Sequence, residues 1–138
     1  MIVDATDQIV GRLGAIVAKK ALLGEKIDIV NAEKAVISGK KEVVLAKFKQ
    51  KVARGTWAKG PHYIRAPDML LKRLIRDMLP YKKPRGITAF KNIMCWQGIP
   101  AQFKDQKQVR FKEADASKLT VSYVSIKNIS RFLGGKVD

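Results

Sequence analysis

The pattern of hydrophobic and polar positions in the first forty residues predicts a strand, a helix and two further strands. Residues 2–5, IVDA, form a short apolar strand. A helix starts at Gly11 and is stopped by Gly24. Its apolar positions recur at helical spacing and are Leu13, Ile16, Val17 and Ala21. The nearly all-apolar run 27–31, IDIVN, is typical of a strand covered on both faces, and 35–39, AVISG, offers another strand. This order of elements predicts a parallel α/β layer.

The middle of the chain predicts two helices separated by a long loop. The first helix covers 40–54, and its one apolar stripe is Val44, Phe48 and Val52. Residues 55–66, GTWAKGPHYIRA, combine glycines, a proline, aromatic rings and cations, and we expect a functional loop there. The second helix, 67–79, begins at Pro67, which suits a first turn, and ends before Pro80. Its apolar face is Leu70, Leu71, Leu74, Ile75 and Met78.

The last third of the chain predicts further elements of both kinds. A short helix from about 86 to 93 leads into a candidate strand, NIMCWQG. The run LTVSYV then predicts a C-terminal strand, followed by a helix that Ser125 caps and Gly134 ends. We expect one domain over residues 1–138, with the strand and helix from about 119 packed on it.

The composition changes this picture through its charge. The 138 residues are 46% hydrophobic, enough to form a core, yet the formal net charge is +16. Such an excess of cations predicts a polyanionic partner. Nucleic acid fits better than a membrane surface, because neither a basic amphipathic helix with bulky apolar residues opposite nor a lipidation signal is clear, and no apolar run is long enough to span a bilayer. We expect a cytoplasmic protein. Cys95 and His62 are the only residues of their types, which excludes an internal disulfide and a zinc site built from Cys and His.

The positive charge is concentrated in residues 40–91, which hold 15 basic residues against Glu42, Asp68 and Asp77, a net +12 of the total +16. A charge kept only for solubility would be spread over the chain and partly balanced. On the helix 67–79, Lys72, Arg73 and Arg76 lie within about 100° of one another, opposite the apolar face. The distribution therefore favours a binding surface that places cations at fixed spacings, as a phosphate backbone requires.

The aromatic side chains of the loop allow two interpretations. Trp57, His62 and Tyr63 lie among Lys59 and Arg65, and planar rings beside cations stack on unpaired bases. Alternatively, Trp57 or Tyr63 anchors the loop on the core. Both alternatives stay open from the sequence, whereas Trp96, in an apolar strand run, is expected in the core.

Motifs for nucleotide chemistry fail at required positions. A dinucleotide-binding G-x-G-x-x-G from Gly11 would need glycine at Leu13 and Ile16, and GTWAKGPH lacks the Lys and Ser or Thr of a phosphate-binding loop. Carboxylates near strand ends are expected to serve as caps and partners rather than as a catalytic pair: Asp4, Asp7, Asp28 and Glu33. We expect no enzyme, while a DNA-binding regulator and a nucleotide-using enzyme remain as competing classes.

Three segments in the same order resemble one protein family: DATDQIVGRLGAIVAKKALLGEKIDIVNAEKAVISGKK, then RAPDMLLKRLIRDMLPYKKPRG, then AFKNIMCWQGIP. Over about residues 3–103 the chain resembles the universal large-subunit ribosomal protein thirteen in its archaeal and eukaryotic form. Asp77 stands where that family usually has glycine. The resemblance implies a single three-layer α/β/α domain with a mostly parallel sheet of about four strands. It also implies a structural role in the large ribosomal subunit, with ribosomal RNA and neighbouring ribosomal proteins as partners and with no cofactor, metal, membrane or small-molecule substrate.

On this resemblance, the basic block predicts the RNA contacts. Pro80 and Pro84 would hold Lys82, Lys83 and Arg85 in a rigid turn against the RNA backbone, and Gly86 would let the chain pass close to the RNA. The complete set of predicted RNA-binding residues is Lys40, Lys41, Arg54, Trp57, Lys59, His62, Tyr63, Arg65, Lys72, Arg73, Arg76, Lys82, Lys83 and Arg85.

Overall fold

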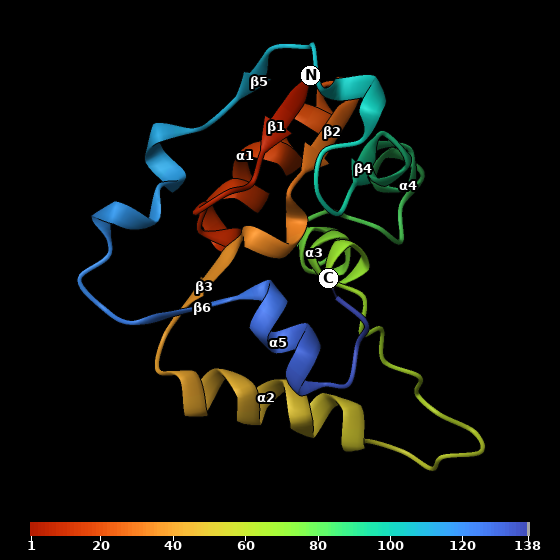
Figure 1. Cartoon of the computed structure of the whole chain (residues 1–138). Coiled ribbons are helices and arrows are strands. Elements are labelled where there is room, and N and C mark those ends of the chain that lie inside the picture. The colour runs from red at the N-terminus through yellow and green to blue at the C-terminus, as the bar shows by residue number, and fades with distance from the viewer. Residues whose placement is uncertain (138) are drawn as a thin grey trace.

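A four-stranded parallel sheet lies at the centre of the computed structural model, which describes residues 1–137 (Figure 1). The strands run in the order β4-β2-β1-β5, and their bounds are β1 Ile2–Asp4, β2 Ile27–Val30, β4 Ile93–Cys95 and β5 Gln108–Val109. Ile29 is paired with Val3 on one side and with Cys95 on the other, and all three side chains are buried. The predicted α/β class with a mostly parallel sheet is confirmed.

A separate two-stranded antiparallel ribbon corrects one part of the expected sheet. The segment at 35–39 does form a strand, β3 (Val36–Ser38), but it pairs with β6 (Tyr123–Ser125) rather than joining the parallel sheet. Asn31, in the left-handed conformation at a φ of 54°, and a single 3-10 turn at Ala32–Lys34 separate β3 from β2. The fourth strand of the parallel sheet is instead β5, which sequence reasoning missed.

Five α-helices are present in the described chain: α1 Val10–Leu22, α2 Lys41–Ala53, α3 Pro67–Arg76, α4 Pro84–Lys91 and α5 Ile126–Phe132. The predicted cap of α5 is confirmed, because the Ser125 hydroxyl accepts a hydrogen bond of 3.3 Å from the Asn128 N–H. The helix predicted to continue to residue 79 ends at Arg76. Met78 therefore lies in a turn, where it is partly exposed, and its sulfur covers Gly14 of α1.

The hydrophobic core joins the sheet to α1 and α3. Leu13 and Val17 of α1 are fully buried, as are Leu71 and Ile75 of α3, and these two helices contact each other. The helix α2 contributes only Val44 and Phe48 as buried residues and contacts α5 and β6. It runs along the lower edge of the molecule in Figure 1, and most of its surface is therefore open to a partner.

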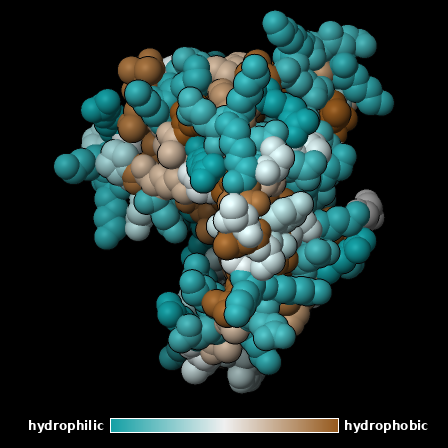
Figure 2. All heavy atoms as spheres, turned by 90° about the vertical axis from the view of Figure 1, so that its left-hand side faces the viewer, coloured by the Kyte–Doolittle hydropathy of each residue, from teal (hydrophilic) through white to brown (hydrophobic). Residues whose placement is uncertain are grey.

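The part of the molecule opposite α2, which includes β5, has a more even balance of positive and negative charges. Residues 104–118 hold five basic and three acidic side chains. Figure 2 shows the face that carries β5 and the following turns, and hydrophilic side chains cover most of it. Hydrophilic surface is therefore not confined to the basic block 40–91, which differs from residues 104–118 in its larger excess of positive charge. Within residues 1–137, no helix has the length and apolar character needed to cross a bilayer.

Candidate nucleic-acid interface

A cationic groove lies between the C-terminal end of α2 and the outer face of α3. It encloses about 200 Å³, and its lining residues are Lys51, Arg54, Pro61, Tyr63, Arg73, Arg76 and Asp77. Four of these seven side chains are cations, and one is a carboxylate. The apolar stripe of α2 turns toward α5 and the core, which leaves Lys51 and Arg54 at the groove. The fold thus brings together cations from two helices that are separated by the loop 55–66.

Each basic side chain predicted on the outer face of α3 lies over an aromatic ring. The Lys72 Nζ lies 4.8 Å from the centroid of the Phe90 ring, and the Arg73 Cζ lies 4.6 Å from that of Tyr63. The Arg76 Cζ lies 4.8 Å from the centroid of Tyr81. These cations were predicted as binding residues opposite the apolar face of the helix, and the structure shows that they are half-buried. Contact with a ring attracts the charge and restricts the long side chain, so the charges are ordered before any partner arrives.

Carboxylates within residues 1–137 neutralise few of the cations. Among residues 1–137, the ion pairs are Lys20 with Glu25, at 3.6 Å, and Arg76 with Asp77, at 3.4 Å. The Nε of Arg76 is buried, and within the described residues it has no hydrogen-bond partner. The remaining positive charge of the block 40–91 is therefore free to interact with an external anion.

The loop 55–66 is held at both ends. Near its start, the Gly60 N–H donates to the Thr56 carbonyl at 2.8 Å, and the Lys59 N–H donates to the Thr56 hydroxyl at 3.3 Å. Gly55 has a φ of 80°, and a Cβ there would overlap with the Gly60 carbonyl, so only glycine fits. At the other end, the buried Ser130 hydroxyl of α5 donates to the Arg65 carbonyl at 2.5 Å. The loop extends away from the body between α2 and α3 (Figure 1).

The structure shows which of the two aromatic residues, Trp57 and Tyr63, packs on the core, a question that the sequence could not decide. Tyr63 is half-buried, packs edge-on against Phe48 with 6.5 Å between ring centroids, and anchors the loop on the core. Its burial raises the pKa of the phenol, and the charge of Arg73 partly opposes this shift. Trp57, in contrast, is 95% exposed and does not anchor the loop on the core. The core interpretation therefore holds for Tyr63 and fails for Trp57.

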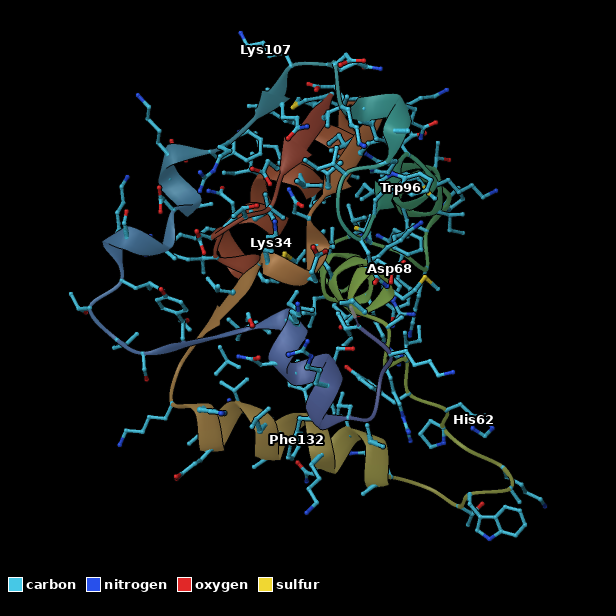
Figure 3. The ribbon with its side chains drawn as sticks, in the orientation of Figure 1. Lys34, His62, Asp68, Trp96, Lys107 and Phe132 are labelled. Carbon is cyan, nitrogen blue, oxygen red and sulfur yellow. The ribbon has the colours of Figure 1, made fainter. Side chains whose placement is uncertain are left out.

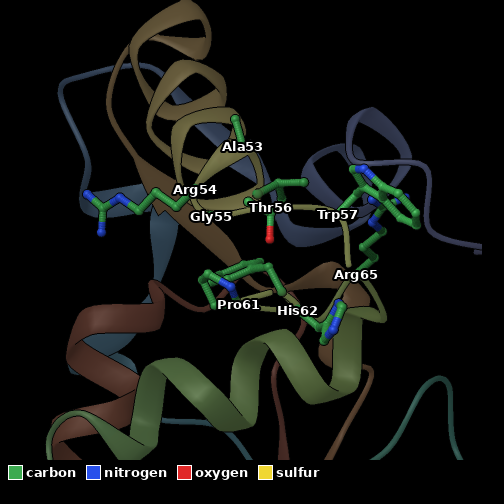
Figure 4. A pocket seen from close by; sticks show the side chains of 10 residues that line it. Ala53, Arg54, Gly55, Thr56, Trp57, Pro61, His62 and Arg65 are labelled. Atoms are coloured by element: carbon green, nitrogen blue, oxygen red, sulfur yellow. The ribbon is translucent and has the colours of Figure 1, made fainter. Parts of the chain in front are cut away.

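A second hollow lies beside the groove, at the base of the loop. It encloses about 530 Å³ between the end of α2 and residues 55–65, and Arg54, Pro61 and Tyr63 line both hollows. Figure 4 shows the Thr56 hydroxyl pointing toward Pro61 across this space, with Trp57, His62 and Arg65 on one side of it. The two hollows are therefore neighbours, and together they form a basic depression on the side of α2, the loop and α3.

Comparison with known proteins decides the family. The sequence pattern of the family described as Ribosomal protein L13 matches residues 1–102. The chain belongs to the ribosomal protein L13 family. Over 135 residues it is 39% identical to "Large ribosomal subunit protein uL13" of Archaeoglobus fulgidus, covering 96% of this chain and 86% of that protein. It is 42% identical over 140 residues to the protein of the same name from Methanococcus maripaludis, covering 99% and 98%.

Two of the strand-end carboxylates, Asp4 and Asp28, accept hydrogen bonds inside the fold, which agrees with the partner role predicted for them. Asp4 accepts hydrogen bonds from Asn31 Nδ2 at 2.9 Å and from the Thr6 hydroxyl at 2.7 Å. Burial by itself would raise the pKa of Asp4, but these hydrogen bonds lower it overall. Asp28 accepts from the Trp96 indole at 3.0 Å, and Trp96 is half-buried at the sheet edge rather than in the core.

The other predicted contacts lie apart from the groove. Lys40 and Lys41 stand at the start of α2, about 20 Å from Arg54 by the rise of the helix, and Lys40 lines a separate hollow at the β3–β6 ribbon. Lys82 and Lys83 lie in the turn after α3, whereas Pro84 begins α4 and Arg85 lies in its first turn. The L13-family chain thus presents its cations on several sides of the molecule.

Two expectations about this region are corrected. Lys82, Lys83 and Arg85 do not share one proline-bracketed turn, because Pro84 already belongs to α4. Gly86 is buried, and a Cβ there would overlap with the Pro80 carbonyl, so the glycine serves an approach of the chain to itself. Sequence reasoning also missed Lys51, Tyr81 and Phe90. The position of Lys51, three residues before Arg54 on one helix, was the available signal for it.

Proposed function

We propose that the protein is a structural component of the large ribosomal subunit in the cytoplasm and that it binds ribosomal RNA through the depression between α2, the loop and α3. One observation carries this proposal: aromatic rings hold the cations of α3, namely Lys72, Arg73 and Arg76, in place. Among the described residues, a carboxylate pairs with only one of these three cations. Relatives that match nearly the whole chain are named as large-subunit ribosomal proteins, which supports the assembly.

The arrangement suits a phosphate backbone better than a small anion. Lys51 and Arg54 on one wall and Arg73 and Arg76 on the other present four positive groups along an open groove. A folded RNA brings phosphates from adjacent strands into such a groove, and each neutralised phosphate releases a counterion. Phosphate contacts position a protein on RNA, whereas contacts with unpaired bases confer specificity. The groove is therefore proposed to position the protein.

Several predicted sites add to this surface from other sides. Lys40 and Lys41 at the start of α2, together with Lys82, Lys83 and Arg85 around the start of α4, extend cations beyond the groove. Such a distribution fits a protein embedded among several RNA segments and neighbouring ribosomal proteins, and it does not fit a regulator that reads one DNA groove with one helix. The proposal assigns no catalytic step.

A binding experiment with purified RNA tests the proposal. The nucleic-acid-free protein is titrated with protein-free large-subunit ribosomal RNA of an archaeal relative over a series of salt concentrations, with small-subunit RNA as the matched competitor. We expect tighter binding to the large-subunit RNA and an affinity that falls steeply as salt rises. Equal binding to both RNAs at physiological salt, or no binding to either, would contradict the proposal.

A further inference from the structure

We propose that the hollow beside Trp57 binds a single unpaired nucleotide of the RNA, with its base stacked on the indole and its phosphate held by Arg65. This inference rests on the proposed function and adds a base-binding site to the phosphate-binding groove. Its starting observation is that Trp57, with 95% of its surface exposed, covers no part of the core. A large aromatic side chain that the fold does not bury is available to a ligand.

The position of Trp57 is fixed although its side chain is free. The hydrogen bonds from Gly60 and Lys59 to Thr56 close a short turn that contains Trp57, and the Arg65 carbonyl is held by Ser130 of α5. A stacking platform on such a turn loses little conformational entropy when a base binds. In Figure 3, the loop carries its side chains away from the body of the protein, beyond His62.

The chemistry of the hollow matches a nucleotide. Its volume of about 530 Å³ lies within the usual range of small-ligand sites, and its lining contains an indole, an imidazole, a hydroxyl and two guanidinium groups. Figure 4 shows Trp57, His62 and Arg65 on the same side of the hollow, while Arg54 extends away from them. A base can stack on the indole, and the phosphate of the same nucleotide can then bind Arg65, which lines the same hollow.

The charge around Trp57 favours RNA, rather than an apolar pocket of a neighbouring protein, as the partner of its indole. Residues 43–67 contain no Asp or Glu, so Lys59 and Arg65 flank Trp57 without a carboxylate in the same segment. Insertion of Trp57 into an apolar protein pocket would desolvate these cations without pairing them, which is costly. A nucleotide supplies a π face and an anion together. Because Arg54 and Tyr63 line both hollows, the backbone of the same RNA strand can continue into the α2–α3 groove.

Two RNA probes separate the base site from the phosphate groove. Binding of the full chain is measured to a six-nucleotide single-stranded oligouridylate and to a fully paired RNA hairpin of similar phosphate number. Trp57→Leu removes the ring and Trp57→Phe keeps a smaller one, while Tyr123→Leu on β6 is the matched loss of another exposed ring. The emission of Trp57, taken as the difference between wild type and Trp57→Phe, reports stacking directly.

We expect Trp57→Leu to weaken binding of the oligouridylate about 5- to 150-fold, which is the range for loss of one base stack, and to change hairpin binding less than twofold. Trp57→Phe should retain most of the affinity, Tyr123→Leu should match wild type, and the oligouridylate should quench Trp57. Unchanged oligouridylate binding by Trp57→Leu, with normal binding of large-subunit RNA by wild type, would overturn this inference and leave the proposed function standing. Loss of large-subunit RNA binding by wild type would overturn both.

Discussion

The guanidinium of Arg73 lies over the ring of Tyr63, with its Cζ 4.6 Å from the ring centroid, and this contact ties the loop 55–66 to α3. Tyr63 also packs edge-on against Phe48 of α2, so one ring connects both walls of the groove. The contact orders a cation at the centre of the basic depression and at the same time fixes the base of the loop. If the groove binds RNA as proposed, we expect binding and local stability to be coupled at Arg73.

Arg73→Ala should weaken RNA binding and flatten its salt dependence. We expect the slope of log affinity against log salt to fall by about 0.7 to 0.9, the value for one phosphate that the protein no longer neutralises. Lys107→Ala is the matched control, because it removes one positive charge at the opposite end of the molecule from α2 (Figure 3). Binding titrations over a salt series check this. Equal slopes for the two variants would show that the groove does not contact phosphate.

The same substitution should also cost a small amount of stability. Removal of the guanidinium from the Tyr63 ring is expected to lower the free energy of unfolding by about 0.5 to 1 kcal/mol. Denaturant unfolding of Arg73→Ala measures this loss. Arg73→Lys separates the charge from the planar stacking on the ring, because lysine keeps only the charge. A variant as stable as wild type would mean that the ring contact does not order the side chain.

Removal of the cations around the start of α4 should affect binding and leave the fold intact. The side chains of Lys82, Lys83 and Arg85 are exposed, so the triple alanine variant should melt close to the wild-type temperature. The slope of its log RNA affinity against log salt should fall by up to about 0.7 to 0.9 for each phosphate that these side chains neutralise in the wild type. Thermal melts and RNA titrations of the same preparation decide the matter. Unfolding of the variant would show that this segment has a structural role instead.

Gly86 and Gly11 provide a matched pair of glycine substitutions with opposite expected effects. In Gly86→Ala, the new Cβ would overlap with the Pro80 carbonyl, and we expect a loss of about 1 to 3 kcal/mol in unfolding free energy. In Gly11→Ala, no atom lies within 4 Å of the new Cβ, and alanine favours the helix by about 0.5 to 1 kcal/mol. Denaturant unfolding measures both, and a neutral Gly86→Ala would contradict the close approach of the chain to itself.

The buried Cys95 predicts a loss of stability in alkali. Burial raises the pKa of this thiol from 9.0 to about 12. Because the unfolded thiol ionises first, the stabilising contribution is fully present below pH 9 and is lost between pH 9 and pH 12. Wild type should therefore lose about 1 kcal/mol of unfolding free energy by pH 10 relative to Cys95→Ala, which lacks the group. Denaturant unfolding at pH 8 and pH 10 checks this, and a pH-independent difference between the two proteins would refute it.

The sequence predicted those elements whose signals are local. The apolar periodicity of α1 and the serine cap of α5 depend on neighbouring residues, and both predictions are confirmed. The strand β5 has only two residues and no apolar run, so nothing local marks it. The pairing of β3 with β6 depends on a partner far along the chain, which no local pattern specifies.

For the candidate site, the sequence indicated the charge but not its arrangement. The excess of cations in residues 40–91 was visible from composition, whereas the contact of Lys72 with Phe90 exists only after α4 packs beside α3. Likewise, a glycine at position 86 is expected whether the chain passes close to RNA or close to itself. Only the fold shows that Gly86 lies against Pro80. The role of the cations in RNA binding stays a prediction.

Sedimentation of the tagged protein from a cell lysate tests the central claim most directly. The lysate is resolved on a sucrose gradient before and after a high-salt wash, and RNA is extracted from the fractions that contain the protein. The protein should co-sediment with large ribosomal subunits and remain there through moderate salt, whereas high salt weakens phosphate contacts. Its presence only in light fractions, free of ribosomal RNA, would contradict the claim.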